Sequence, residues 1–280
     1  MDHDGRSALG GRTVLAVFAH PDDESLACGG TLARLSDAGA RVVLICASRG
    51  ENGSISDPVL VPDGDLAGVR TRELQQAAAI LGITDLVILD HPDGDLRWAH
   101  VPQFHAEIVA AVEQYRPDAV ITFAEDGLYW HLDHIGVHER TYTALRSLGA
   151  GMPPLYYVTM SAGSMQDVVQ AAHAKGGAAP DSSFWGIAPD AFGAAAKPPT
   201  FSVNVRHWVA RKLAALRCHR TQMGRDNPIA WIGDDEARTL LGLEYFRREG
   251  LTRLDALEAL GEPIRIDVNR LLVADATRNA

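Results

Sequence analysis

The chain has 280 residues, of which 46% are hydrophobic and 22% are charged, a composition typical of a soluble globular protein with a substantial core. Its formal net charge of −10 argues against nucleic acid or an anionic membrane surface as the main partner. The first residues show no basic segment leading into an apolar one, and the apolar runs are too short to span a bilayer, so we expect a cytoplasmic protein. The widely spaced Cys28, Cys46 and Cys218 suggest neither a disulfide framework nor a thiolate metal site.

Apolar runs alternate with segments of helical periodicity through the first part of the chain. Because these runs lack polar alternation, they predict strands that are buried on both faces of a parallel sheet. The predicted strands lie at residues 13–18, 41–47, 86–89, 119–123 and 155–159, and the predicted helices between them lie at 29–38, 69–81, 103–115 and 135–148. This order predicts an α/β protein with right-handed crossovers.

The alternation weakens after the fifth predicted strand. Residues 164–174 predict a helix, whereas residues 176–199 are rich in Gly, Ala and Pro and predict an irregular cover or linker. A strand at 201–205, a helix at 208–218, a short helix at 251–260 and an edge strand at 271–273 complete the prediction. We expect one domain over 1–280, with a core at 12–160 and a C-terminal region at 161–280 that covers the site.

A histidine and two carboxylates follow the first strand, in the segment Ala-His-Pro-Asp-Asp-Glu that contains His20 and Asp23. In open parallel sheets, ligands bind beyond the carboxyl ends of the strands, so these residues are candidate metal ligands. A further ligand must come from elsewhere in the chain. The exit of the fourth strand carries His131 and His134, which lie three residues apart at a helix start and so share one side.

Asp22 is a candidate general base, because its side chain diverges from that of Asp23 and could accept the proton of a metal-bound water. One histidine of the second pair would remain to stabilise a developing oxyanion or a leaving group. Together these residues describe metal-assisted hydrolysis. The structural alternatives are a helix N-cap for Asp22 and a packing role for Tyr129 over the sheet edge.

The two motifs, Ala-His-Pro-Asp-Asp-Glu at 19–24 and His-Leu-Asp-His at 131–134, resemble the paired signatures of the PIG-L/LmbE-like de-N-acetylases. The resemblance covers residues 12–160. It implies a Rossmann-like α/β fold, a single zinc ion and removal of acetyl groups from N-acetylglucosamine-containing substrates. The second motif departs from the usual His-Pro-Asp-His, because Leu132 replaces proline without removing a functional group.

The resemblance also implies a role for each matching residue. The metal ligands would be His20, Asp23 and His134, with zinc as the expected ion and iron or cobalt as alternatives. The catalytic residues would be Asp22 as general base, His131 as the electrophilic or acid partner, Asp133 as the carboxylate that orients a histidine, and Tyr129 as a group that polarises the amide carbonyl.

Three residues fall where family members contact the sugar, namely Glu51, Arg70 and Asp93. Arg70 could instead be an ordinary helix charge paired with Glu73, and acidic residues in glycine-rich loops often serve only the turn. Gln222 also resembles a family position, but the sequence assigns it no role.

We therefore expect a metal-dependent hydrolase of a small-molecule amino-sugar substrate, with the association of identical chains left open. An amidase of thiol–sugar conjugates with the same site is the close alternative. A sugar-nucleotide transferase on a Rossmann-type sheet is the alternative from a different class. No Gly-x-Gly-x-x-Gly follows the first strand, which argues against that second alternative.

Overall fold

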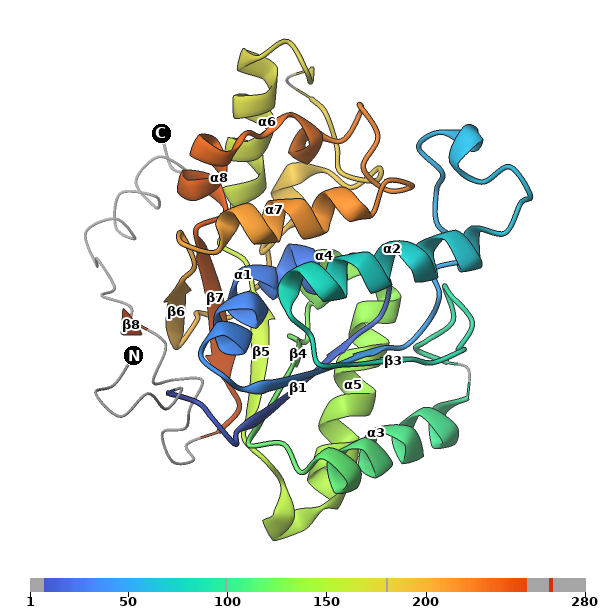
Figure 1. Cartoon of the computed structure of the whole chain (residues 1–280), viewed down its shortest axis with the longest axis vertical. Coiled ribbons are helices and arrows are strands. Elements are labelled where there is room, and N and C mark those ends of the chain that lie inside the picture. The colour runs from blue at the N-terminus through green and yellow to red at the C-terminus, as the bar shows by residue number, and fades with distance from the viewer. Residues whose placement is uncertain (1–7, 99, 180, 251–261, 264–280) are drawn as a thin grey trace, which may run out of the picture.

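The computed structural model describes residues 8–98, 100–179, 181–250 and 262–263. Within this part of the chain one mixed sheet is sandwiched between two helix layers (Figure 1). The strand order is β3-β2-β1-β4-β5-β7-β6-β8. The strands are β1 (Thr13–Phe18), β2 (Arg41–Cys46), β3 (Asp85–Ile88), β4 (Ala119–Phe123), β5 (Leu155–Thr159), β6 (Phe201–Asn204), β7 (Leu243–Arg248) and β8 (Glu262–Pro263).

The first five strands are parallel, as predicted, and the last three are antiparallel to their neighbours. β1 pairs with β2 on one side and with β4 on the other, so the direction of winding reverses between β1 and β4. A crevice forms at such a switch point, beyond the carboxyl ends of the two strands. Both histidine motifs follow these strands, so the topology brings them together.

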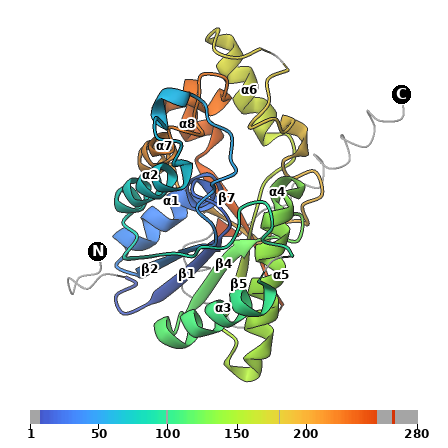
Figure 2. The ribbon, with the colours of Figure 1, turned by 90° about the vertical axis from the view of Figure 1, so that its right-hand side faces the viewer.

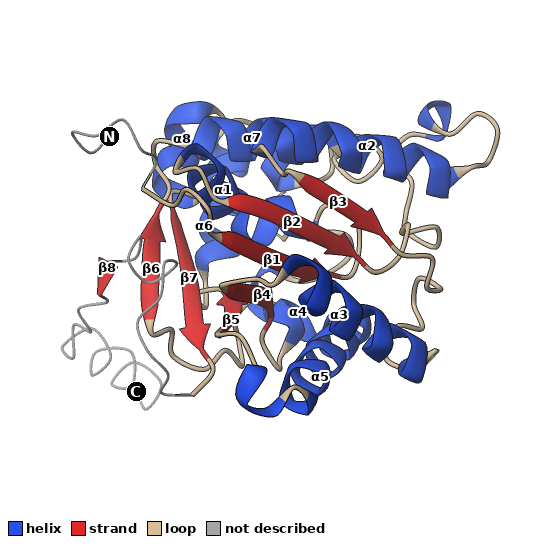
Figure 3. Ribbon diagram, turned by 60° about the horizontal axis from the view of Figure 1, so that its bottom comes forward, coloured by secondary structure: helices blue, strands red, loops and turns tan. Residues whose placement is uncertain are grey.

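One helix layer contains α1 (Asp23–Asp37), α2 (Leu66–Leu81) and α7 (Val209–Cys218), and the other contains α3 (Val101–Tyr115) and α5 (Leu132–Ser147) (Figures 2 and 3). A short helix, α4 (Gly127–Trp130), leads into α5. The strands bury both faces between these layers, and residues such as Leu15, Val17 and Phe18 have no exposed side-chain surface. None of the helices in the described residues is long and apolar enough to cross a bilayer.

A second apolar cluster lies above the first layer, around α6 (Ser164–Ala174) and α8 (Asp234–Leu240). This cluster brings together Leu26 of α1, Val168 of α6, Leu213 of α7 and Phe192 of the segment before β6. Short 3-10 turns at Pro58–Leu60, Gly149–Gly151, Pro189–Ala191 and Pro228–Trp231 connect the longer elements. The predicted irregular segment 176–199 contains only one of these turns among its described residues, and Phe184 and Phe192 anchor it in this second apolar cluster.

The helix and strand predictions differ from the structure at several places. α1 begins at Asp23, six residues before the predicted start, and α5 begins at Leu132 rather than at residue 135. The sequence analysis missed β7 and α8. The helix predicted at 251–260 and the strand predicted at 271–273 lie outside the described residues.

Candidate metal and active site

The turn between β1 and α1 places three charged side chains in the crevice. Asp22 has a backbone φ of 119°, a left-handed value that is rare for a residue with a Cβ atom. Two hydrogen bonds hold the turn, because Asp23 Oδ2 accepts from the His20 backbone N–H at 2.7 Å and Glu24 Oε2 accepts from the Asp22 N–H at 3.1 Å. Backbone strain of this kind persists where surrounding contacts enforce it, often at functional sites.

His134 and Asp23 form the most informative contact. His134 is fully buried, and its Nδ1 lies 3.1 Å from the Gly127 carbonyl oxygen, so Nδ1 carries the proton in the neutral ring. Its Nε2 is then an acceptor, yet it faces Asp23 Oδ1 at 3.1 Å and has no hydrogen-bond partner among the described residues. A bound cation would satisfy two acceptors that face each other in this way.

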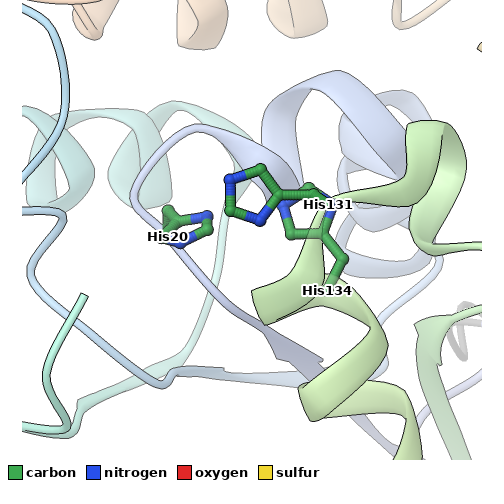
Figure 4. A group of neighbouring side chains, drawn as sticks. All are labelled: His20, His131 and His134. Carbon is green, nitrogen blue, oxygen red and sulfur yellow. The ribbon is translucent and has the colours of Figure 1, made fainter. Parts of the chain in front are cut away.

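His20 completes this group from the first motif. Its Nε2 donates to Asp133 Oδ2 at 3.0 Å and lies 3.1 Å from Asp93 Oδ1, while its Nδ1 is 3.4 Å from Asp23 Oδ2. Burial disfavours the imidazolium, but these carboxylates outweigh it and raise the pKa of His20. Figure 4 shows the rings of His20, His131 and His134 gathered at one point, and one nitrogen from each lies within 4.8 Å of the others.

His131 is held by the start of α5. Its backbone is extended, with φ of −65° and ψ of 123°, and its Nδ1 accepts from the Asp133 N–H at 3.2 Å, so the ring acts as a helix N-cap. Nε2 is therefore the nitrogen that carries the proton in the neutral ring. Burial and the neighbouring His134 and His20 lower the pKa of His131 to about 4, which keeps the ring neutral at pH 7.

Asp22 lies beside Arg70, which reaches it from α2. Arg70 is 3% exposed and donates to Pro21 O at 2.6 Å, Gly50 O at 2.9 Å and Asp22 Oδ2 at 3.2 Å. A Cβ atom on Gly50 would lie 2.3 Å from Nη1 of this guanidinium, so the loop requires glycine there. Burial raises the pKa of Asp22 to about 6, although the Arg70 charge favours the carboxylate.

These side chains line one cavity of about 330 Å³. The wall includes His20, Asp22, Asp23, Arg70, Asp93, Tyr129 and His131. Tyr129 is half-buried, and its ring centroid lies 5.2 Å from that of His134 and 4.6 Å from that of Phe192. Burial and the carboxylates of Asp23 and Asp22 raise the pKa of Tyr129, so its hydroxyl stays protonated.

Three predicted residues do not line this cavity, namely His134, Asp133 and Glu51, and His134 lies buried behind Asp23. Asp133 is fully buried behind His20, where it also accepts from the backbone N–H groups of Gly94 and Leu96 at 2.7 and 2.9 Å. Glu51 is exposed, and its Oε1 accepts from the Asp93 N–H at 2.8 Å. The adjacent Asn52 lines the cavity instead and donates to Asp93 through its backbone N–H at 2.8 Å.

The C-terminal region adds residues to which the sequence gives no definite role, since Trp185 in a Gly/Pro-rich segment could either line the pocket or anchor its loop. Trp185 and Gln222, from the C-terminal region, line the cavity, and the Trp185 Nε1–H donates to the Gln222 carbonyl at 2.9 Å. His219 is fully buried, with Nε2 3.1 Å from Glu24 Oε1. The sequence signal for these three was the aromatic pair in the Gly/Pro-rich segment and the motif His-Arg-Thr-Gln, but neither indicated a partner.

Comparison with known proteins agrees with this arrangement. A family profile described as "PIG-L: GlcNAc-PI de-N-acetylase" matches residues 15–145. The 1D-myo-inositol 2-acetamido-2-deoxy-alpha-D-glucopyranoside deacetylase of Acidothermus cellulolyticus is 31% identical over 264 residues, which cover 84% of this chain and 88% of that protein.

Two solved structures share the fold. The N,N'-diacetylchitobiose deacetylase of Pyrococcus horikoshii has a TM-score of 0.58 at 22% identity, covering 85% of this chain and 84% of its own. The 4-carboxy-2-hydroxymuconate hydratase of Pseudomonas putida KT2440 has a TM-score of 0.61 at 17% identity, covering 88% of this chain and all of its own. The fold therefore serves more than one reaction, and the sequence match carries the assignment. The chain belongs to the PIG-L family of GlcNAc-PI de-N-acetylases.

Proposed function

We propose that this chain hydrolyses the N-acetyl amide of a small amino-sugar glycoside. The observation that carries the proposal is the contact of His134 Nε2 with Asp23 Oδ1, two buried acceptors 3.1 Å apart, at the wall of the cavity that Asp23 and Asp22 line. The relatives in this family are named as deacetylases of an N-acetylglucosaminyl inositol. These names favour deacetylation over cleavage of a thiol–sugar amide or sugar transfer.

A divalent metal fits the donor set of His20, Asp23 and His134. Asp133 and Asp93 face His20 Nε2, which leaves His20 Nδ1 on the side of Asp23. Two imidazole nitrogens and a carboxylate suit zinc, and iron or cobalt are accepted by the same donors. When bound, the ion would polarise the amide carbonyl and lower the pKa of the attacking water.

Asp22 is positioned to take the proton from that water. Its pKa of about 6 leaves it mostly ionised at pH 7, yet close enough to the working pH to return the proton to the departing amine. Arg70 holds the carboxylate in place through Nη2, while its Nη1 donates to the Gly50 carbonyl.

His131 supports the developing oxyanion in this proposal. Its Nδ1 is committed to the Asp133 N–H, so the neutral ring presents Nε2–H to the cavity as a hydrogen-bond donor. Tyr129 offers a protonated hydroxyl from the neighbouring wall. Donors aimed at the carbonyl oxygen in this way stabilise the transition state more than the substrate.

The sugar would lie between Arg70 and Asp93, which both line the cavity. The Asp93 carboxylate can accept a hydrogen bond from a sugar hydroxyl. The Arg70 guanidinium already donates hydrogen bonds to Pro21, Gly50 and Asp22. Glu51 contributes indirectly, because it fixes the Asp93 backbone. We therefore assign Arg70 and Glu51 to the support of the site and Asp93 to contact with the sugar.

The test combines metal analysis with acetate release from N-acetylglucosaminyl glycosides. Asp22→Asn is expected to retain the metal while losing about 10²–10⁴-fold in kcat, because it can no longer accept a proton. His134→Ala is expected to lose the metal. Asp63→Asn, an exposed substitution outside the cavity, serves as the control. Normal turnover by Asp22→Asn would overturn the assignment of the base, and full metal binding by His134→Ala would overturn the ligand assignment.

A further inference from the structure

The segment that follows α7 reads His-Arg-Thr-Gln and covers residues 219–222. Its glutamine lines the catalytic cavity, whereas His219 and Thr221 are fully buried and do not line it. α7 packs against both α1 and α2 in one helix layer (Figure 1). The segment therefore reaches both helices that support Asp22, namely α1 through its first turn and α2 through Arg70.

The His219 ring contacts Glu24 at the start of α1. Its Nε2 lies 3.1 Å from Glu24 Oε1, while its Nδ1 is buried without a hydrogen-bond partner among the described residues. Because an ionised carboxylate can only accept, the ring nitrogen that faces it carries a proton. Within the described part of the chain, Glu24 is thus the one hydrogen-bond partner of this ring.

Glu24 in turn holds the backbone of the candidate base. Its Oε2 accepts from the Asp22 N–H at 3.1 Å, and its Oε1 also accepts from the Ser25 hydroxyl at 2.5 Å. Asp22 has a φ of 119°, which a residue with a Cβ atom keeps only where its surroundings enforce it. Because His219 fixes one oxygen of Glu24, the other oxygen stays aimed at the Asp22 N–H.

Thr221 holds α2 through the buried carboxylate of Glu73. The Thr221 N–H and hydroxyl donate to the two oxygens of Glu73 at 2.9 and 2.7 Å. Glu73 lies three residues after Arg70, so both side chains share one face of α2. The ion pair of Arg70 is with Asp22, whose Oδ2 lies 3.2 Å from Nη2, and not with Glu73. Thr221 thus fixes the helix that brings this guanidinium to the base.

We propose that His219 and Thr221 are positioning residues for the general base Asp22. The first acts on the backbone of the base through Glu24, and the second acts on its carboxylate through Arg70. This inference rests on the proposed function, because it takes Asp22 as the group that accepts the proton. A base must lie within hydrogen-bond reach of that proton, and a displacement of about 1 Å can cost about a hundredfold in rate. Neither positioning residue lines the catalytic cavity, so each acts only through Asp22.

The first test measures acetate release from N-acetylglucosaminyl glycosides by the zinc-loaded full chain, with kcat expressed per bound metal. His219→Ala should lower kcat by about tenfold to a hundredfold with KM and metal content unchanged, because the base is displaced and the substrate contacts are not. Thr221→Val should lower kcat by about threefold to tenfold, since the backbone N–H still donates to Glu73. Thr221→Val changes neither charge nor shape appreciably, so it tests the proposal even if His219→Ala fails to fold.

Conservative variants separate positioning from packing. His219→Gln and Thr221→Ser keep a donor for the same carboxylates, so each should recover most of the lost kcat. Thr141→Val on α5 is the matched control for Thr221→Val. The Thr141 hydroxyl is also buried, but it has no hydrogen-bond partner among the described residues, so kcat should stay unchanged.

Double variants show whether the effects pass through the base. In the Asp22→Asn background the base is already lost, so adding His219→Ala or Thr221→Val should lower the residual kcat by less than about twofold. A general loss of structure would instead lower kcat by the same factor in both backgrounds. Equal factors would therefore overturn the proposal.

The contact with the backbone has a readout that needs no turnover. Hydrogen exchange of the Asp22 amide in the full chain, followed by NMR, should be about tenfold faster in His219→Ala than in the wild type, because Glu24 is no longer fixed. The amides of β1 should keep their exchange rates. Unchanged exchange at Asp22, or an equal increase throughout β1, would overturn the role of His219.

The outcomes separate this inference from the proposed function. Absence of acetate release by the wild-type chain would overturn the proposed function, while exchange of the Asp22 amide would still test the support of the turn. Acetate release with unchanged kcat in both His219→Ala and Thr221→Val would overturn the positioning roles alone.

Discussion

Glu24 holds the turn that carries the candidate general base, although it does not line the cavity itself. Its Oε2 accepts from the Asp22 backbone N–H, and its Oε1 lies 3.1 Å from His219 Nε2. Glu24 is 1% exposed and His219 is fully buried, so their contact is shielded from solvent, and Glu24 is the largest charge that acts on His219. The residue that caps the C-terminus of α7 thus supports the first motif at the start of the adjacent helix α1.

This pair predicts a pH dependence of stability. Burial disfavours the imidazolium, but the charges of Glu24 and Asp22 outweigh both burial and Arg70 and raise the pKa of His219. Because the pKa is raised in the folded state, the stabilisation is fully present below the unfolded pKa of about 6.5 and is lost as pH rises through the folded pKa.

The measurement compares the free energy of unfolding of the metal-free chain with that of metal-free His219→Gln, by denaturant unfolding between about pH 5.5 and 9. This range brackets the titration of a histidine whose pKa is raised above about 6.5. At the acidic end His219→Gln should lose about 1.5–3 kcal/mol, the contribution of a charge-assisted buried hydrogen bond, and the difference should shrink at the alkaline end. Protonation of the candidate metal-binding residues, such as His20 and His134, affects both proteins alike, so it cancels in the difference between their free energies of unfolding. A difference that stays constant or grows with pH would contradict the raised pKa.

The residue types of the site could be predicted from sequence, but their contacts could not. The charge that follows an apolar strand indicated His20, Asp22 and Asp23, because packing offers no reason for ionisable groups there. Arg70 and Glu51 were expected to contact the sugar. In the structure Arg70 lines the cavity and also donates to the Gly50 carbonyl, and Glu51 accepts from the Asp93 N–H; no local sequence pattern indicates these two hydrogen bonds.

The start of α5 is the element that delivers His131 to the cavity. The segment before it is strained, since Leu128 and Trp130 have φ values of 68° and 66°. His131 itself is extended, and Leu132 follows as the first helical residue, with 51% of its surface exposed. An extended residue followed by a first helical position is the backbone that proline favours.

Leu132→Pro, which restores the proline of the usual motif, is therefore expected to be tolerated. It should raise the free energy of unfolding by about 0.4–1 kcal/mol by restricting the unfolded chain, a gain measurable as a higher Tm. Trp130→Pro is the contrasting control, because its positive φ is incompatible with the ring, and it should destabilise the protein. A lower Tm for Leu132→Pro would show that the Leu132 side chain or its N–H has a role that the backbone does not reveal.

Periodicity predicts the elements that bury an apolar run or an apolar helix face, and it misses β7, which buries the charged Glu244, and the short α8. The five parallel strands are almost wholly apolar, and their runs without polar alternation predict all five. Periodicity places the start of α1 at residue 29, whereas the helix begins at Asp23 and has the carboxylates of Asp23 and Glu24 in its first turn. β7 reads Leu-Glu-Tyr-Phe-Arg-Arg, and its polar positions concealed a strand that pairs with both β5 and β6.

At the scale of the whole molecule, the C-terminal region completes the sheet as well as covering the site. β7 lies beside β5, and α7 packs against both α1 and α2. α1 is kinked at Cys28, whose φ of −149° is not helical. The first N–H groups after such a kink need hydrogen-bond partners from outside the helix. Glu244 of β7 accepts from the N–H groups of Gly30 and Thr31 at 2.9 and 2.7 Å, so a late strand caps the restart of the first helix.

Lys212 of α7 binds the same carboxylate, with Nζ 2.6 Å from Glu244 Oε1, and both residues are 3% exposed. Glu244→Gln would leave Lys212 as an uncompensated buried charge and should lower the free energy of unfolding by about 3–5 kcal/mol. The double variant Glu244→Gln/Lys212→Met removes that charge and should recover part of the loss. Asp37→Asn, which breaks an exposed pair with Arg211, should cost at most about 1 kcal/mol.

Denaturant unfolding followed by two probes measures these changes and tests whether 1–280 behaves as one domain. The capped helix α1 belongs to the parallel core, whereas the capping residue Glu244 belongs to β7 in the C-terminal region. If the two parts fold together, both probes should report one unfolding transition, and Glu244→Gln should shift it. Two separate transitions, with only one moved by Glu244→Gln, would instead divide the chain into units that unfold independently.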